Sequence, residues 1–177
     1  MEFTVLGPVQ ARVGGGPVEV GGPKPRTLLA VLAVNAGRVV SHDRLVDELW
    51  GEQPPDGSRS TIYTYVSILR RALGAVLVRS GGGYLLTVDP GQVDLHVFEA
   101  EVADGRRALA EGDLEGAAAR FAAALERWRG TPLGGTQGAW AEGERSRLDE
   151  LRLGALEDRG DADLALGRGE RLIPELT

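Results

Sequence analysis

The chain has 177 residues, of which 42% are hydrophobic and 26% charged, the balance of an ordinary globular protein. That length suffices for one large domain or two small ones, each with its own core. The absence of cysteine excludes disulfides, thiolate zinc sites and cysteine nucleophiles. The sequence has no long apolar run and its N-terminus lacks the pattern of a secretory signal, so we expect a cytoplasmic location.

The net charge of −6 is unevenly distributed along the chain. Residues 1–90 carry nine basic and eight acidic residues, net +1, whereas residues 91–177 carry eleven basic and eighteen acidic residues, net −7. Within the first half, residues 57–88 contain four arginines and no acidic residue. This local basic segment fits a polyanionic partner, although the total charge does not.

The first fifty residues predict a small sheet and two helices. The runs EFTVL, PVQARV and PVEV, with a glycine turn at 14–16, are typical of short antiparallel strands. The apolar run RTLLAVLAVNA predicts a buried helix that ends at Gly37. Ser41 then caps a second helix, HDRLVDELW, with Asp43 in its first turn and Gly51 at its end.

The stretch STIYTYVSILRRAL is rich in β-branched residues, which by themselves favour a strand. However, Ile62, Val66, Leu69 and Leu73 recur at i, i+4, i+7 and i+11, the spacing of one helix face. We therefore predict a helix over 58–73, capped by Ser58. The runs AVLVRS and GYLLTV, joined by the glycines at 81–83, predict a hairpin after it.

The second half shows three helical patterns and no strand signal. Their apolar faces carry, in order, Leu95, Phe98, Val102 and Leu109; then Leu114, Ala118, Phe121, Leu125 and Trp128; then Trp140, Leu148, Leu151 and Ala155. The third pattern runs from 139 to about 166. Gly160 interrupts it at a cost of roughly 1 kcal/mol relative to alanine, which leaves the continuity of that helix open.

The helix at 58–73 is the strongest candidate for a functional element. With its apolar stripe toward the core, it exposes a face of hydroxyls, one isoleucine and one arginine: Ser60, Thr64, Ser67, Ile68 and Arg71, with Tyr63, Tyr65 and Arg70 on its flanks. Such a helix, followed by a basic hairpin, fits insertion into the major groove of DNA. The alternative is a solvated helix face with incidental arginines.

Enzymatic readings find little support. The glycine-rich stretch before Lys24 is not a phosphate-binding loop, because Pro23 and Pro25 flank the lysine. His42 and His96 begin different helices, and no third metal ligand accompanies them. We therefore expect no catalytic residue, no cofactor and no metal.

Two motifs, VSILRRALG and GGYLLTV, resemble those of OmpR-type winged-helix DNA-binding domains. The segments from LVRSGGGYLLTV through RFAAALERWRGTPL to DADLALGR are similar to the antibiotic regulatory protein (SARP) family of the AfsR/DnrI type. The resemblance implies a mainly α fold with small β elements, with a winged helix-turn-helix domain at 1–90. A tetratricopeptide-like bacterial transcriptional activation domain follows at 91–177, incomplete at its C-terminus. Leu172, Ile173 and Leu176 are then expected either to be exposed or to mediate self-association.

The resemblance also implies roles for individual residues. Thr64, Ser67, Ile68 and Arg71 would face bases or nearby phosphates together with Ser60. Ile68 departs from the family pattern, because related winged helices often carry a basic base-reading residue there, and an exposed isoleucine would contact a thymine methyl group instead. The DNA backbone would be held by Arg59, Thr61, Tyr65 and Arg70, with Arg79 in the wing. The segment facing RNA polymerase would comprise Glu52, Gln53, Pro54, Pro55 and Asp56.

As a function, the resemblance implies a transcriptional activator of a secondary-metabolite gene cluster. Two protomers would bind direct repeats in double-stranded DNA side by side and recruit RNA polymerase holoenzyme through its sigma and alpha subunits. The alternative is a tetratricopeptide-like protein-interaction module with only incidental affinity for DNA.

Overall fold

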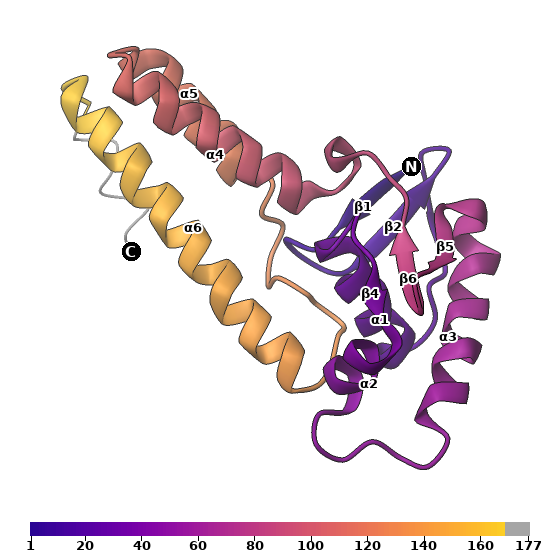
Figure 1. The fold of residues 1–177 in the computed structure, drawn as a ribbon. Helices are drawn as coiled ribbons and strands as arrows, with labels where there is room; N and C mark the ends of the chain where they lie inside the picture. Colours follow the sequence, from indigo (N-terminus) through magenta and orange to yellow (C-terminus); the bar gives the residue numbers. More distant parts are fainter. Residues whose placement is uncertain (169–177) are drawn as a thin grey trace.

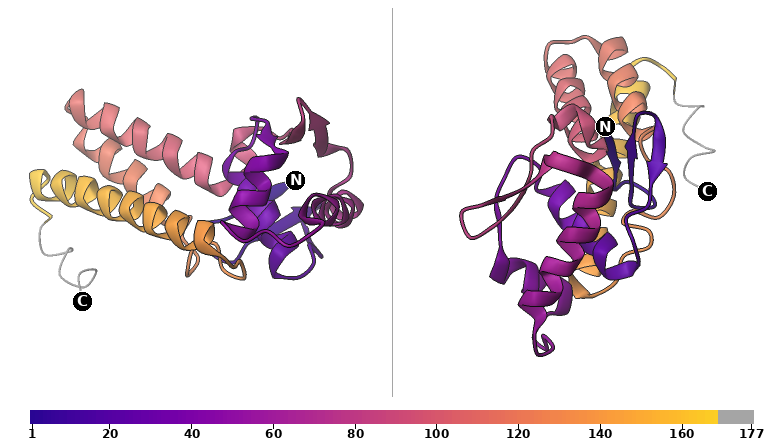
Figure 2. Two further views of the ribbon diagram at one scale, coloured as in Figure 1. Left: turned by 60° about the horizontal axis from the view of Figure 1, so that its bottom comes forward. Right: turned by 90° about the vertical axis from the view of Figure 1, so that its right-hand side faces the viewer.

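The computed structural model describes residues 1–168 and confirms the predicted class, mainly α with small β elements. Three short strands come first, and three helices and a second small sheet follow; a long helical hairpin and one further helix complete the fold (Figure 1). The helices α4 to α6 extend away from the N-terminal part, on the side opposite α3 (Figures 1 and 2).

The predicted N-terminal sheet consists of β1 (Glu2–Thr4), β2 (Gln10–Val13) and β3 (Gly16–Val18), paired antiparallel in that order. Phe3 lies opposite Ala11, and both side chains are buried. The alternation along the strands therefore turns one face of this sheet to the core.

The first two helices match the sequence pattern. Helix α1 (Pro23–Val34) begins at Pro23, where a missing N–H costs nothing, and ends before Asn35, three residues earlier than the predicted stop at Gly37. Helix α2 (His42–Trp50) is capped as predicted, because the Ser41 hydroxyl accepts a hydrogen bond from the Arg44 N–H at 3.2 Å.

Helix α3 (Ser58–Leu73) has the predicted bounds, and all four residues of its apolar stripe are buried. One detail of the prediction was wrong: the N-cap is Gly57, and Ser58 is the first helical residue. The periodicity of the buried residues therefore decided the conformation of this segment against its β-branched composition.

The predicted hairpin consists of β5 (Leu77–Ser80) and β6 (Gly83–Leu86). Strand β4 (Val40–Ser41) pairs with β6, giving the order β4-β6-β5. Tyr84 and Leu86 turn their side chains into the core. We call residues 77–86 the wing.

The second half contains α4 (Asp94–Ala110), α5 (Leu114–Leu125) and α6 (Ala139–Ala165). Helices α4 and α5 pack against each other as a helical hairpin, in which Asp113 caps α5 by accepting the Gly116 N–H at 2.9 Å. Helix α6 continues through Gly160 without interruption. The apolar pattern placed Trp128 on α5, but this helix ends at Leu125 and Trp128 lies beyond it.

The N-terminal segment is hydrogen-bonded to the loop between α5 and α6. Four backbone bonds join residues 5–9 to residues 129–134: Arg129 N–H to Leu6 O (2.9 Å), Leu133 N–H to Val5 O (2.8 Å), Gly134 N–H to Gly7 O (3.0 Å) and Val9 N–H to Gly134 O (2.9 Å). The Asp94 carboxylate accepts the N–H groups of Val5 (2.8 Å) and Leu6 (3.2 Å). Burial raises the pKa of Asp94, and these hydrogen bonds oppose that shift.

These contacts make one continuous hydrophobic core that includes both Phe3 and Phe98. The division after residue 90 into a DNA-binding and an activation domain stays a prediction. It does not separate two hydrophobic cores.

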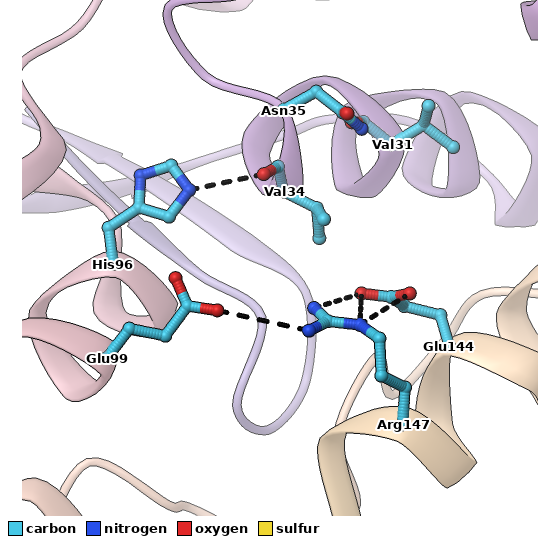
Figure 3. Close-up of polar contacts among 7 residues, drawn as sticks. All are labelled: Val31, Val34, Asn35, His96, Glu99, Glu144 and Arg147. Atoms are coloured by element: carbon cyan, nitrogen blue, oxygen red, sulfur yellow. Dashed lines mark hydrogen bonds and ion pairs between the residues drawn. The ribbon is translucent and has the colours of Figure 1, made fainter. Parts of the chain in front are cut away.

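A polar cleft of about 590 Å³ lies where α1 and α2 face α4 and α6. Figure 3 shows the Arg147 guanidinium between Glu144 (2.6 Å) and Glu99 (3.9 Å), and His96 Nε2 is 3.1 Å from the Val34 carbonyl oxygen. The charged groups of Arg147 and the two glutamates thus satisfy one another and tie α4 to α6.

Among residues 1–168, no helix is long and apolar enough to cross a membrane. The expectation for Leu172, Ile173 and Leu176 lies outside the described residues.

Candidate nucleic-acid interface

Helix α3 presents a polar face to solvent. Ser60, Thr64, Ser67 and Arg71 are all exposed, and they lie opposite the buried stripe. Helices α1 and α2 pack against the buried side of α3. The exposed face is therefore held on a rigid support, as a base-reading helix requires.

The hydroxyl groups on this face are held by local backbone bonds. The Ser60 hydroxyl donates to the Gly57 carbonyl oxygen (2.7 Å), and the Ser67 hydroxyl donates to that of Tyr63 (2.8 Å). The Thr61 hydroxyl also donates to Gly57 O, at 3.2 Å. Each oxygen keeps free lone pairs, so these groups can accept hydrogen bonds from base amino groups as they stand.

The four arginines of the basic segment have different environments. The Arg71 side chain is exposed and has no hydrogen bond or ion pair among residues 1–168. Arg59 forms an exposed ion pair with Asp43. Arg70 points toward the wing, where its Nε donates to the Leu77 carbonyl oxygen at 2.9 Å. Arg71 is thus the arginine of α3 whose charge is entirely available to a ligand.

Arg70 and Arg79 also contact aromatic rings. The Arg70 guanidinium lies 5.8 Å from the centre of the Tyr84 ring, and that of Arg79 lies 5.8 Å from the Tyr63 ring. These cation–π contacts tie α3 to the wing. The prediction placed both arginines on the DNA backbone, and the structure gives them a second role in orienting the wing.

Sequence reasoning missed His42, which lies between α3 and the wing. Its ring centre is 5.1 Å from that of Tyr63 and 6.1 Å from that of Tyr84. Burial and the Arg59 charge lower the pKa of His42, Asp43 partly opposes this, and Arg79 lowers it further. The imidazole is therefore neutral at pH 7, and it serves as a packing group between the helix and the wing.

Ile68 and Tyr65, both predicted to contact DNA, lie on the flank of α3 that carries Thr61. The expectation that Ile68 is exposed was wrong. Ile68 is half-buried rather than exposed, and its Cγ2 would lie 3.4 Å from a Cβ atom on Gly21. Tyr65 is also half-buried, because its ring stacks on Trp50 with the centres 6.4 Å apart. Both residues pack against neighbouring elements, which leaves only part of each side chain for DNA.

The segment predicted to face polymerase forms the exposed connection between α2 and α3, which projects at the bottom of the molecule in Figure 1. Glu52, Gln53, Pro54, Pro55 and Asp56 are all exposed. We call residues 52–56 the α2–α3 loop. Its two carboxylates make it an acidic projection beside a basic helix.

Within the described part of the chain, no group of three or more His, Asp and Glu side chains is placed to hold a metal ion. The exposed side of α3 and the wing present hydroxyls, arginines and aromatic rings, groups that contact nucleic acids in proteins.

Comparison with known proteins agrees with this arrangement. Residues 18–90 match the family described as "Transcriptional regulatory protein, C terminal", and residues 93–177 match "Bacterial transcriptional activator domain". Regulatory protein DnrI of Streptomyces peucetius is 43% identical, over all of this chain and 70% of DnrI. Regulatory protein AfsR of Streptomyces griseus is 38% identical, over all of this chain and 18% of AfsR.

A solved structure, Mycobacterium tuberculosis EmbR in complex with low affinity phosphopeptide, superimposes with a TM-score of 0.90 at 37% identity. The match covers 99% of this chain and 48% of that chain. The chain thus spans less than half the length of AfsR and EmbR. DnrI and AfsR are named regulatory proteins and EmbR a transcriptional regulatory protein, which are non-enzymatic roles. The resemblance seen in the sequence is confirmed: the chain belongs to the SARP family of transcriptional activators.

Proposed function

We propose that this chain binds direct repeats in double-stranded DNA, with α3 in the major groove and the wing at the neighbouring phosphates or minor groove. One observation carries the proposal: α3 exposes the unpaired Arg71 guanidinium together with Ser60, Thr64 and Ser67 on a single supported face. A protein face that displays a free cation and hydrogen-bonding groups is suited to both phosphates and base edges.

The remaining assignments have support of differing strength. Arg79 and Arg70 lie at the wing and reach the DNA backbone while they remain stacked on tyrosines. Arg59 can contact a phosphate only by sharing its charge with Asp43. The accessible parts of Ile68 and Tyr65 lie beside Thr61 on the opposite flank, where Ile68 would contact a thymine methyl group.

Activation is assigned to contacts with RNA polymerase holoenzyme. We propose that the α2–α3 loop meets polymerase through its sigma and alpha subunits, and that residues 91–177 contribute to activation. Residues 1–90 would supply the DNA contacts. Two protomers would lie side by side on repeats spaced by about one helical turn, roughly 10 to 11 base pairs, so that both meet the same face of DNA.

As a biological role, we propose control of a secondary-metabolite cluster by a protein acting at the nucleoid. The relation to DnrI and AfsR, both named regulatory proteins of Streptomyces, supports this assignment.

The experiment is a titration of the whole chain with DNA fragments from upstream of candidate promoters, with shuffled fragments as controls. We expect tighter binding to fragments with tandem repeats, and an affinity that falls steeply as salt rises from about 50 to 200 mM. Inserting half a helical turn between the repeats should abolish paired binding. Equal affinity for shuffled DNA, with a shallow salt dependence, would reject this proposal and favour a protein-interaction module with only incidental affinity for DNA.

A further inference from the structure

Lys24 lies in the first turn of α1 and contacts the end of α2. Its Nζ donates a hydrogen bond to the Leu49 carbonyl oxygen, and it lies 5.5 Å from the centre of the Trp50 ring. Helix α2 ends at Trp50, so no N–H group of α2 donates a hydrogen bond to the carbonyl oxygen of Leu49. A cation at this position also complements the negative end of the helix dipole.

Trp50 connects this contact to α3. Its ring stacks on Tyr65, with the two planes inclined by 22°. Lys24, Trp50 and Tyr65 therefore form a continuous stack, which we call the Lys24 clamp. The clamp joins three helices: Trp50 is the last residue of α2, and Tyr65 lies near the middle of α3.

The ends of the α2–α3 loop are also held by backbone bonds. The Gly51 N–H donates to the Asp47 carbonyl oxygen (2.7 Å) with Gly51 at φ +64°, a conformation that favours glycine. The Ser58 N–H donates to Pro55 O at 3.0 Å. By contrast, no side chain of residues 52–56 has a hydrogen bond or ion pair among the described residues. The shape of the loop therefore depends on what holds its two ends.

We propose that Lys24 is a positioning residue, which acts through Trp50 and Tyr65 to hold the α2–α3 loop in the conformation that activation requires. This inference rests on the proposed role of the loop in contacting polymerase. The hydrogen bond and the ring contact of Lys24 are made with α2, and not with residues 52–56 or the exposed face of α3. Loss of Lys24 should therefore alter the loop while leaving the base-reading face in place.

The test compares Lys24→Met with a matched loss of charge, Arg38→Met. Methionine keeps the length and apolar character of the lysine stem but removes its donor and its charge. The Arg38 side chain is exposed and has no hydrogen bond or ion pair among the described residues, so its removal controls for charge alone. Lys24→Arg restores a cation that can stack on Trp50 and donate to the Leu49 carbonyl oxygen.

Hydrogen exchange of the amides of residues 51–58 is the first readout. We expect exchange at least about fivefold faster in Lys24→Met, near-normal exchange in Lys24→Arg and no change in Arg38→Met. Operator affinity should remain within about twofold for all three variants, whereas stimulation of transcription in vitro should fall several-fold in Lys24→Met alone. Unchanged exchange in Lys24→Met would overturn the inference, and so would faster exchange with full stimulation.

A loop variant separates this inference from the proposed function. Glu52→Ala combined with Asp56→Ala removes the acidic groups of the loop and leaves the Lys24 clamp intact. Full stimulation by this double variant and by Lys24→Met would reject the polymerase role of the loop, and with it the positioning role of Lys24 in activation. Reduced stimulation by the double variant alone would preserve the loop's role and reject Lys24 as its positioning residue.

Discussion

Arg70 and Arg71 are adjacent in the sequence, and the structure predicts opposite consequences for their removal. Arg71→Ala removes a side chain with no partner among the described residues, so the free energy of unfolding should change by no more than about 0.5 kcal/mol. Arg70→Ala removes the hydrogen bond to Leu77 O and the contact with the Tyr84 ring. These two contacts at a partly exposed site amount to about 1–2 kcal/mol.

The effects on DNA binding should differ in kind as well. If Arg71 neutralises one phosphate, its removal reduces the slope of log K against log salt by about 0.9 for every sequence. If Arg71 instead reads a base, its removal weakens binding to the repeat by about 1–3 kcal/mol and relaxes specificity there. Arg70→Ala should weaken binding mainly because the wing is no longer held beside α3.

Urea unfolding followed by circular dichroism measures the first quantity, and fluorescence anisotropy with labelled repeat DNA at several salt concentrations measures the second. Arg107→Ala is the control: this arginine lies on α4, in the part of the molecule remote from α3, in an exposed ion pair with Asp104 (Figure 1). DNA affinity and salt slope both unchanged in Arg71→Ala would show that the exposed face of α3 does not meet DNA. A fully stable Arg70→Ala protein would refute the wing anchor.

Three further predictions test individual contacts. A Cβ on Gly83 would lie 2.0 Å from the Val40 carbonyl oxygen, so Gly83→Ala should lower the free energy of unfolding by about 1–3 kcal/mol in urea denaturation. Gly143 has open space around it, so the control Gly143→Ala should not lower the free energy of unfolding. The lowered pKa of His42 means that the native state binds fewer protons than the unfolded chain as pH falls. The free energy of unfolding should therefore decrease as pH drops from about 7.5 to 5.5. His42→Phe, which cannot titrate, should show a smaller decrease in the same assay. Lys24 is the only lysine of the chain, so reductive methylation with ¹³C-formaldehyde labels one side chain besides the N-terminus. Because burial lowers the pKa of Lys24, its signal should titrate at lower pH than in an unfolded control, and equal titration would contradict the burial of this amine.

Local sequence patterns were sufficient for most secondary structure. The spacing of Ile62, Val66, Leu69 and Leu73 identified α3 as a helix because burial of one face stabilises a helix more than β-propensity opposes it. Ser41 and Gly51 likewise marked both ends of α2 through capping chemistry that acts within a few residues. The same helical projection correctly placed Ser60, Thr64, Ser67 and Arg71 on the exposed face.

Local sequence patterns could not predict which elements pack against the flanks of α3. Periodicity gives the angle of a side chain around its own axis, but it does not say which element lies on either side. Ile68 and Tyr65 therefore looked available to DNA, whereas they pack near Gly21 and on Trp50. For the same reason the anchoring role of Arg70 was invisible until the wing was placed beside it.

The joining of the two halves was decided by tertiary structure alone. The ladder between residues 5–9 and 129–134 consists of backbone hydrogen bonds, and such bonds carry no side-chain signature across a separation of more than a hundred residues. The resemblance to the SARP family implied two domains divided after residue 90, and the buried residues of both halves lie in one hydrophobic core. The sequence alone thus determined which faces are buried and which polar groups remain outside. The long-range packing determined where those groups point and what holds them there, because it depends on which distant segments satisfy each other's backbone and apolar surface.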